Sequence, residues 1–227
     1  MTTTEDLPEA DARYTRIAIA LHWVAASLIL LNLAIGPFME SFAEPCRTTL
    51  ARLHESSGIT ILLLTVVRIV WRVFHRPPRL DPRLSWWEQV AAKAVHGTLY
   101  VAMVAMPLLG WAIISANPPQ VVSARVAIGT APAAKPKRIM IWGLVPLIPI
   151  KSIQAIALER DGKPRQRALH GRLVSVHALG GYLMMLLLAL HLLGAFKHEW
   201  FDGRGGLRRI GVGRRRDRDG YRQPPAE

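Results

Sequence analysis

The sequence predicts an all-α integral membrane protein, a four-helix bundle with an interfacial segment between the third and fourth helices. Hydrophobic residues make up 51% of the 227 residues and charged residues only 20%. The mean hydropathy is positive, which is unusual for a soluble domain of this size. Four stretches have the roughly 20 apolar residues that an α-helix needs to cross a bilayer. These predicted spans are 17–39, 55–75, 94–115 and 172–196.

The first predicted span follows a polar lead that contains Glu5, Asp6, Glu9 and Asp11. A secretory signal peptide instead begins with a basic region, so we expect this span to be retained. The expected domains are a flexible cytoplasmic lead at 1–14, a transmembrane domain at 15–202 and a basic cytoplasmic tail at 203–227.

The formal net charge is +13, which in a soluble protein would indicate nucleic acid as a partner. Here the basic residues gather at the edges of the predicted spans, so we expect a lipid bilayer and no nucleic acid. With four spans, both termini lie on the same side as the 76–93 loop. That side collects many Arg and Lys residues and is therefore predicted to be cytoplasmic, although 116–171 carries nine basic residues on the other side.

The 116–171 segment ends in a second apolar stretch, which Pro146 and Pro149 interrupt. A fifth span is one interpretation of this stretch. Gly143, Lys151 and the two prolines favour the other, a segment that lies on the outer membrane surface and covers the bundle.

Histidines carry the chemical signal, because His22, His54, His96, His177 and His191 lie in predicted spans or at their ends. Ionisable groups inside a membrane are costly and usually functional. His177 and His191 are 14 residues apart, which places both on one helix face with about 21 Å between them. One helix could therefore contribute a ligand to each of two stacked cofactors.

Depth in the membrane predicts how these histidines pair. His22 and His191 lie at the same distance from the cytoplasmic face, and His54 and His177 lie near the outer face. Two bis-histidine pairs are what two six-coordinate haem groups need, whereas zinc needs four ligands at one depth. Hydrogen bonds across helices are the alternative role. His170 could replace His177, but it lies among arginines at the membrane edge.

Haem propionates are anionic and bind basic side chains near the membrane edge. Candidates are Arg16, Arg68 and Arg72 on the cytoplasmic side and Arg172 on the outer side. Each of them could instead extend along the membrane to reach water. The single cysteine, Cys46, excludes an iron–sulfur cluster or zinc site built from cysteines of this chain.

Four segments together resemble the bacterial cytochrome b561 family. They are RYTRIAIALHW at 13–23, LHESSGITILLLTVVRIVWR at 53–72, VHGTLYVAMVAMPLLGW at 95–111 and HALGGYLMMLLLALHLLGAFKHEWFDGRGGLRR at 177–209. The resemblance implies a di-haem b protein of the bacterial inner membrane, with His22, His54, His177 and His191 as axial ligands. It further implies an oxidoreductase that exchanges electrons with ubiquinone at the cytoplasmic side, and superoxide oxidation coupled to ubiquinone reduction as its activity.

His96 and His198 resemble quinone-site residues of that family rather than ligands, because both lie at the cytoplasmic level of the spans. Imidazole there would donate a hydrogen bond to a quinone carbonyl and relay protons, and an interfacial histidine without function is the alternative. The 116–171 segment is longer and more basic than the family pattern. A basic outer surface would attract superoxide or an acidic periplasmic redox protein.

Two other functions stay open at this point. The chain could be a cytochrome b subunit that relays electrons between quinone and a partner dehydrogenase or periplasmic redox protein. It could also be a haem-free membrane transporter or scaffold, which an absorption spectrum would exclude.

Overall fold

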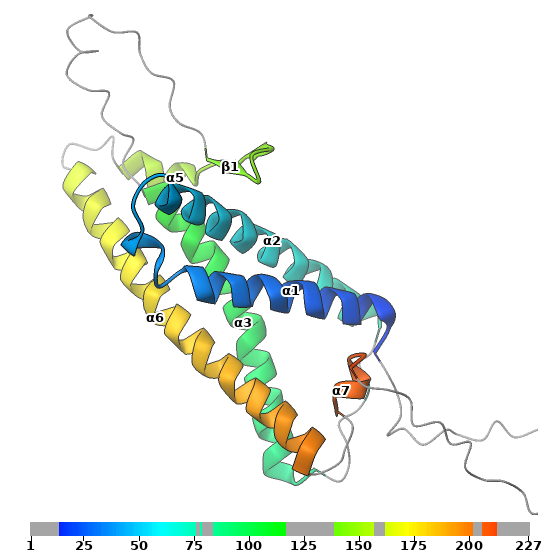
Figure 1. Cartoon of the computed structure of the whole chain (residues 1–227). Helices are drawn as coiled ribbons and strands as arrows, with labels where there is room; N and C mark the ends of the chain where they lie inside the picture. The colour runs from blue at the N-terminus through cyan, green and yellow to red at the C-terminus, as the bar shows by residue number, and fades with distance from the viewer. Residues whose placement is uncertain are drawn as a thin grey trace, which may run out of the picture.

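The computed structural model describes residues 14–75, 78, 84–116, 139–156, 162–201 and 206–212. Within these ranges, four helices are long and apolar enough to cross a membrane, which confirms the predicted fold class (Figure 1). They are α1 (Arg16–Ile35), α2 (Cys46–Phe74), α3 (Trp86–Ala116) and α6 (Gly162–Phe196), the last continuing as the π-helical segment η4 (Lys197–Phe201).

The helices do not end where the predicted spans end. Helix α2 begins at Cys46 rather than at 55, and α6 begins at Gly162, within the segment predicted as a loop up to 171. Apolar composition delimits only the part of a helix inside hydrocarbon, whereas helical hydrogen bonding continues into polar residues at the surface. Helix α1 ends early, at Ile35, because Gly36 and Pro37 follow and proline cannot extend a helix through its own N–H.

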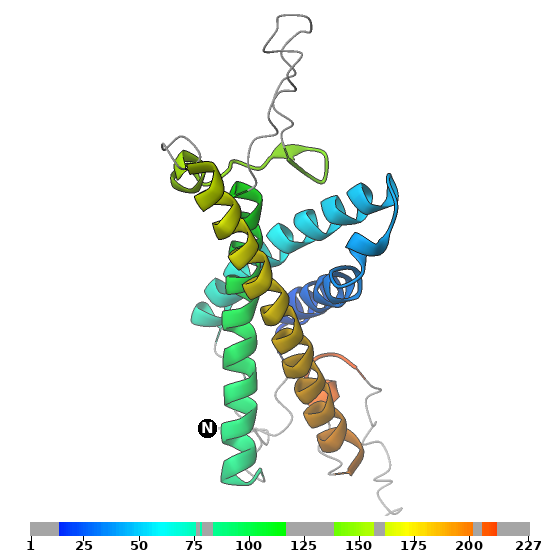
Figure 2. The same ribbon diagram turned by 90° about the vertical axis from the view of Figure 1, so that its left-hand side faces the viewer.

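The helices pack in the order α1 with α2, α2 with α3, and α3 with α6. Ala25, Ile61, Met103 and Met184 form the buried core, and each comes from a different helix. Within the described residues, α6 approaches α3 closely but has no comparable contact with α1 or α2. Figure 2 shows α3 and α6 crossing, with α2 passing behind α3. Helix α6 therefore lies closer to α3 than to the first two helices.

Large apolar side chains cover the outside of the bundle. Leu63 on α2, Val101 on α3 and Leu179 on α6 are 61%, 67% and 70% exposed. A soluble protein rarely exposes so much apolar surface. These faces are those expected to contact lipid.

The 139–156 segment lies at the end of the bundle where α1 ends and α2 begins, which we call the outer end after the predicted orientation, and it does not form a fifth span. Trp142 (φ 52°) and Gly143 (φ 72°) have the left-handed backbone of a tight hairpin turn. The turn closes with a 2.9 Å hydrogen bond from the Leu144 N–H to the Ile141 carbonyl. The segment contains the antiparallel strands β1 (Met140–Ile141) and β2 (Val145–Pro146) and the short helix α5 (Lys151–Ala155).

Hydrogen bonds fix this segment to two of the long helices. On α2, the Trp142 backbone N–H donates to Ser56 Oγ (2.9 Å) and the Trp142 indole N–H donates to Thr60 Oγ1 (3.0 Å). Ser56 is 2% exposed, so its hydroxyl has lost water as a partner. The bonds to α3 are Trp111 Nε1–H to the Ile148 carbonyl (2.9 Å) and Ile150 N–H to Ser115 Oγ (2.9 Å).

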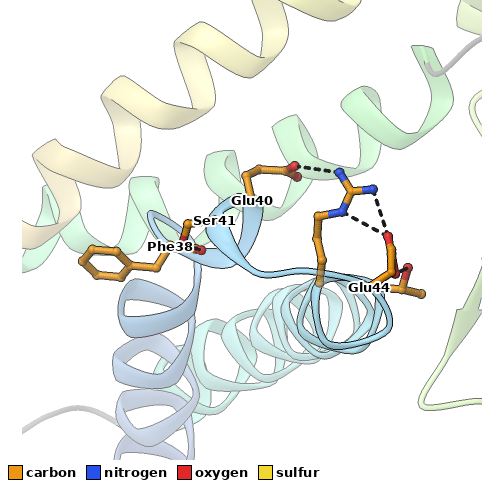
Figure 3. Close-up of polar contacts among 6 residues, drawn as sticks. Phe38, Glu40, Ser41 and Glu44 are labelled. Carbon is orange, nitrogen blue, oxygen red and sulfur yellow. Dashed lines mark hydrogen bonds and ion pairs between the residues drawn. The ribbon is translucent and has the colours of Figure 1, made fainter.

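A charged cluster forms the turn between α1 and α2 at the same end (Figure 3). Arg47 donates from Nη2 and Nε to Glu44 at 2.9 and 3.0 Å, and its Nη1 lies 3.4 Å from Glu40 Oε2. Thr48 Oγ1 donates to the other Glu44 oxygen at 2.7 Å. These bonds, that of Thr48 first, lower the pKa of the Glu44 carboxyl. The cluster marks where the chain leaves the apolar layer.

We expect Ser56→Ala to loosen the 139–156 segment, because the Trp142 N–H would lose its acceptor. Loss of one such hydrogen bond costs about 1 kcal/mol, so local opening should become about fivefold more frequent. Hydrogen exchange of the 139–150 amides measures it. Ser175→Ala is the control, since Ser175 Oγ donates only to the Gly171 carbonyl of its own helix (3.1 Å). Equal exchange in both variants would contradict the expected anchoring.

Candidate functional site

His54 of α2 and His177 of α6 face each other near the outer end of the bundle. Their ring centres are 6.0 Å apart, and the ring planes are nearly perpendicular at 74°. Nδ1 of each ring is buried and makes no hydrogen bond to the other ring. A backbone group of Asn32 approaches the His54 ring, and one of Met106 approaches the His177 ring.

Glycines leave room for both rings of this outer pair. A Cβ atom added to Gly36 would lie 3.3 Å from Cε1 of His54, and one added to Gly110 would lie 3.6 Å from Cε1 of His177. The contact at Gly36 is tighter than ordinary van der Waals distance. The His54 ring can therefore occupy its position because residue 36 has no side chain.

His22 of α1 and His191 of α6 form a second pair at the other end of the bundle. Their ring centres are 6.4 Å apart at an interplanar angle of 55°. The ring of His96 on α3 also approaches His191, at 5.0 Å and 86°. Nδ1 of His96 lies 2.6 Å from the Ala92 carbonyl and donates to it.

The spacing of these pairs can be compared with that of two imidazoles on opposite sides of one metal ion. A metal–nitrogen bond of about 2 Å, and about 1.1 Å from each nitrogen to its ring centre, give about 6 Å between the ring centres. His54–His177 at 6.0 Å and His22–His191 at 6.4 Å fit this distance. His96 at 5.0 Å from His191 is too close. Two imidazoles are the axial set of a six-coordinate haem iron.

The inner pair borders a cavity of about 590 Å³, to which α1, α2, α3 and α6 all contribute. This volume is within the range of sites that bind small cofactors. Five histidines of this end line it together: His22, His75, His96, His191 and His198. Two of the four candidate arginines, Arg68 and Arg72, line it as well.

The other two candidate arginines lie elsewhere. Arg16 is the exposed first residue of α1, and Arg172 is exposed on α6. Neither lines this cavity or the neighbouring one between α2 and α3. Of the four candidate arginines, the described structure therefore places two at the inner cavity, and both come from α2.

Sequence reasoning missed several residues of the inner cavity. The Tyr100 ring lies beneath two of the three arginines that line the cavity, 5.3 Å from Cζ of Arg68 and 5.7 Å from Cζ of Arg72; the third is Arg209. The cation–π geometry holds the guanidinium groups side by side. No pattern in the sequence indicates this contact, because it depends on the rotation of α2 against α3.

An ion pair joins the beginning of α3 to the end of α6. Lys197 Nζ donates to the buried carboxylate of Glu88, whose other oxygen accepts from the N–H and the hydroxyl of Ser85 at 3.0 and 2.8 Å. The Ser-x-x-Glu spacing is the signal of a capped helix start and was open to prediction. The partner Lys197 was not, since it is 109 positions away.

The sequence matches the family model described as prokaryotic cytochrome b561 over residues 13–213. The chain belongs to the prokaryotic cytochrome b561 family. Cytochrome b561 homolog 2 of Escherichia coli (strain K12) is 33% identical over 46% of this chain and 57% of its own length. Cytochrome b562 of Cereibacter sphaeroides is 34% identical over 43% of this chain and 63% of its own length. The probable superoxide oxidase CybB of Yersinia pestis is 26% identical over 45% of this chain and 58% of its own length.

The matched region thus spans little more than half the length of these curated relatives. Members of the family are membrane cytochromes that bind haem b and transfer electrons. This cytochrome is therefore a bacterial membrane protein of oxidoreductase type. The paired histidines suit the iron of a haem, and the arginines that line the cavity suit its propionates.

We expect Gly36→Ala to alter the haem spectrum of this cytochrome, because the new Cβ would press on the His54 ring and change its tilt. The electron paramagnetic resonance spectrum of the oxidised protein measures this as a shift in the largest g value of one signal. Gly171→Ala is the matched control, since an added Cβ there meets nothing within 4 Å. Unchanged signals in both variants would argue against a haem beside His54.

Proposed function

We propose that this cytochrome transfers electrons through two haem b groups from the outer side of the membrane to ubiquinone, and that its activity is superoxide oxidation coupled to ubiquinone reduction. The observation that supports it is the pair of histidine pairs, at 6.0 and 6.4 Å. The two α6 members are 14 residues apart, so the pairs are about 21 Å apart along that helix.

In this proposal His54 and His177 hold the outer haem iron, and His22 and His191 hold the inner one. When bound, the two groups supply one-electron transfer between the two faces of the membrane. Ligation by two imidazoles would favour electron transfer over oxygen binding. Arg68 and Arg72 line the inner cavity and would bind the inner propionates, with Arg16 at the same membrane edge and Arg172 at the outer one.

His96 and His198 would form the quinone site at the inner cavity. Because Nδ1 of His96 already donates to the Ala92 carbonyl at 2.6 Å, its Nε2 is the atom that would face a quinone oxygen, and it would donate to that oxygen in the doubly protonated imidazolium form. Two superoxide anions each give up one electron and leave as O₂, and one ubiquinone takes up two electrons and two protons to become ubiquinol. An imidazole can both accept and donate a proton, which suits the proton part of this reaction.

The proposed orientation places both termini in the cytoplasm of the bacterial cell and the 116–171 segment outside the inner membrane. The nine basic residues of that segment would attract superoxide, with an effect that falls as salt rises. A relative at 26% identity is named a probable superoxide oxidase, which supports this choice of substrate.

The outer hairpin favours a second candidate, a cytochrome b subunit that takes electrons from a docked dehydrogenase or an acidic periplasmic redox protein. Leu144 and Ile148 are 79% and 68% exposed, and large exposed apolar side chains are typical of contact surfaces. A stable co-purifying partner would favour this candidate. Turnover of superoxide by the purified chain alone would favour the first.

We expect each of His22→Ala, His191→Ala, His54→Ala and His177→Ala to lower the haem content from two per chain to about one. Haem quantification with a reduced-minus-oxidised spectrum measures this, and the two variants of one pair should lose the same spectral component. His170→Ala is the control, because His170 lies on the same helix outside both pairs. Loss of haem in the control alone would refute the assignment of the ligands. A colourless wild type would refute haem binding and leave a haem-free transporter or scaffold.

We expect superoxide to reduce the haem b spectrum of the wild type, and His198→Ala and His96→Ala to slow quinone reduction by about 100-fold, the usual contribution of a proton-transferring side chain. Stopped-flow spectroscopy with a ubiquinone analogue separates the two steps. Haem reduction by superoxide should be unchanged in both variants, since neither residue belongs to the outer pair. Normal quinone reduction in both variants would remove them from the quinone site.

A further inference from the structure

A second cavity, of about 670 Å³, lies between the end of α2 and the beginning of α3. We call it the α2–α3 groove. Some residues line both this groove and the inner cavity and so form the wall between the two: Tyr14, Arg72, Pro78, Ala92, His96 and Tyr100. Val73 and Ile69, which also line the groove, are 72% and 41% exposed. The groove therefore opens on the outside of the bundle, where lipid is expected.

The lining of the groove changes from basic to apolar along the membrane normal. Arg72 in the last turn of α2 and Lys93 in the second turn of α3 lie toward the helix ends. Ile69 and Gly97 follow one turn closer to the bilayer centre, because α2 and α3 run in opposite directions. Beyond Gly97, Val101 continues the apolar surface with 67% exposure. This order matches a charged headgroup followed by acyl chains.

The charge of the groove favours an anion. Its described lining contains Arg72 and Lys93 and no carboxylate. Glu88, an acidic residue in the first turn of α3, instead lines the inner cavity and accepts from Lys197. A neutral quinone ring needs no pair of cations, whereas a phosphodiester does.

Gly97 provides the space that an acyl chain would fill. A Cβ atom added there meets nothing within 4 Å. On the opposite side, the Arg72 guanidinium is held 5.7 Å above the Tyr100 ring. A guanidinium has five N–H donors, so Arg72 can bind groups on both sides of the wall.

We propose that the α2–α3 groove is a binding site for one anionic phospholipid of the leaflet at the N-terminal end of α1. Its phosphate lies between Arg72 and Lys93, and the Tyr14 hydroxyl, which also lines the groove, is a further donor. The acyl chains run past Ile69 and Gly97 toward the bilayer centre. Basic pockets between transmembrane helices bind anionic headgroups in this way. The site does not depend on the proposed electron donor or acceptor.

Native mass spectrometry of the purified haem-loaded cytochrome with added dioleoylphosphatidylglycerol or dioleoylphosphatidylcholine tests the proposal. We expect tighter binding of phosphatidylglycerol, and about fivefold weaker binding of it in Lys93→Gln, the loss typical of one basic group at an anionic surface. Lys163→Gln removes the same charge at the first turn of α6, at the other end of the bundle from the groove. This variant should bind phosphatidylglycerol like the wild type. Equal binding of the two lipids, or an unchanged affinity in Lys93→Gln, overturns the proposal.

A second variant blocks the groove without changing its charge. Gly97→Leu should reduce phosphatidylglycerol binding at least as strongly as Lys93→Gln. Gly171→Leu is its control, since Gly171 also has open space around an added Cβ. An unchanged haem absorption spectrum shows that each variant is folded. Displacement of the bound phosphatidylglycerol by a ubiquinone analogue would assign the groove to quinone and overturn the lipid proposal.

Discussion

The fold depends on one geometric constraint, that α6 presents His177 and His191 on the same face at two depths in the membrane. Fourteen residues of helix separate the two imidazoles by about 21 Å. Because neighbouring spans run in opposite directions, a histidine near the start of α1 reaches the level of His191 and one near the start of α2 reaches the level of His177. His22 and His54 occupy those positions, at 6.4 and 6.0 Å from their α6 partners.

Helix α3 makes this arrangement possible by holding α6 away from α1 and α2. It packs along α6, and Gly180 of α6 lies against the Met106 side chain of α3 so closely that a Cβ would displace it. At the inner end, the pair between Lys197 and Glu88 joins the same two helices. A buried carboxylate without its cation would be costly, so this contact resists separation. The space left beside α1 and α2 contains the inner cavity.

Some contacts of the fold and the candidate site could be predicted from the sequence and others could not, depending on whether they are set by helix length or by helix rotation. The spans follow from apolar length, and the meeting of His22 with His191 follows from depth, because the rise per residue is fixed. Contacts that depend on helix rotation, such as Tyr100 beneath Arg68 and Arg72, leave no pattern in the sequence. The same limit explains why only two of four candidate arginines line the cavity. The roles of the histidines in binding haem and quinone stay predictions.

The two ends of the bundle differ in a way that matches the two proposed half-reactions. Oxidation of superoxide releases O₂ and one electron and involves no proton, so the outer site needs access and positive charge but no acid or base. Reduction of a quinone consumes two protons. The inner cavity accordingly gathers the groups able to carry them, His96 and His198, beside the Glu88–Lys197 pair. At the outer end, the 139–156 hairpin is fixed to α2 by Ser56 and Thr60, and the carboxylates of Glu40 and Glu44 are paired with Arg47. This asymmetry is expected of a protein that separates electron entry from proton-coupled electron exit.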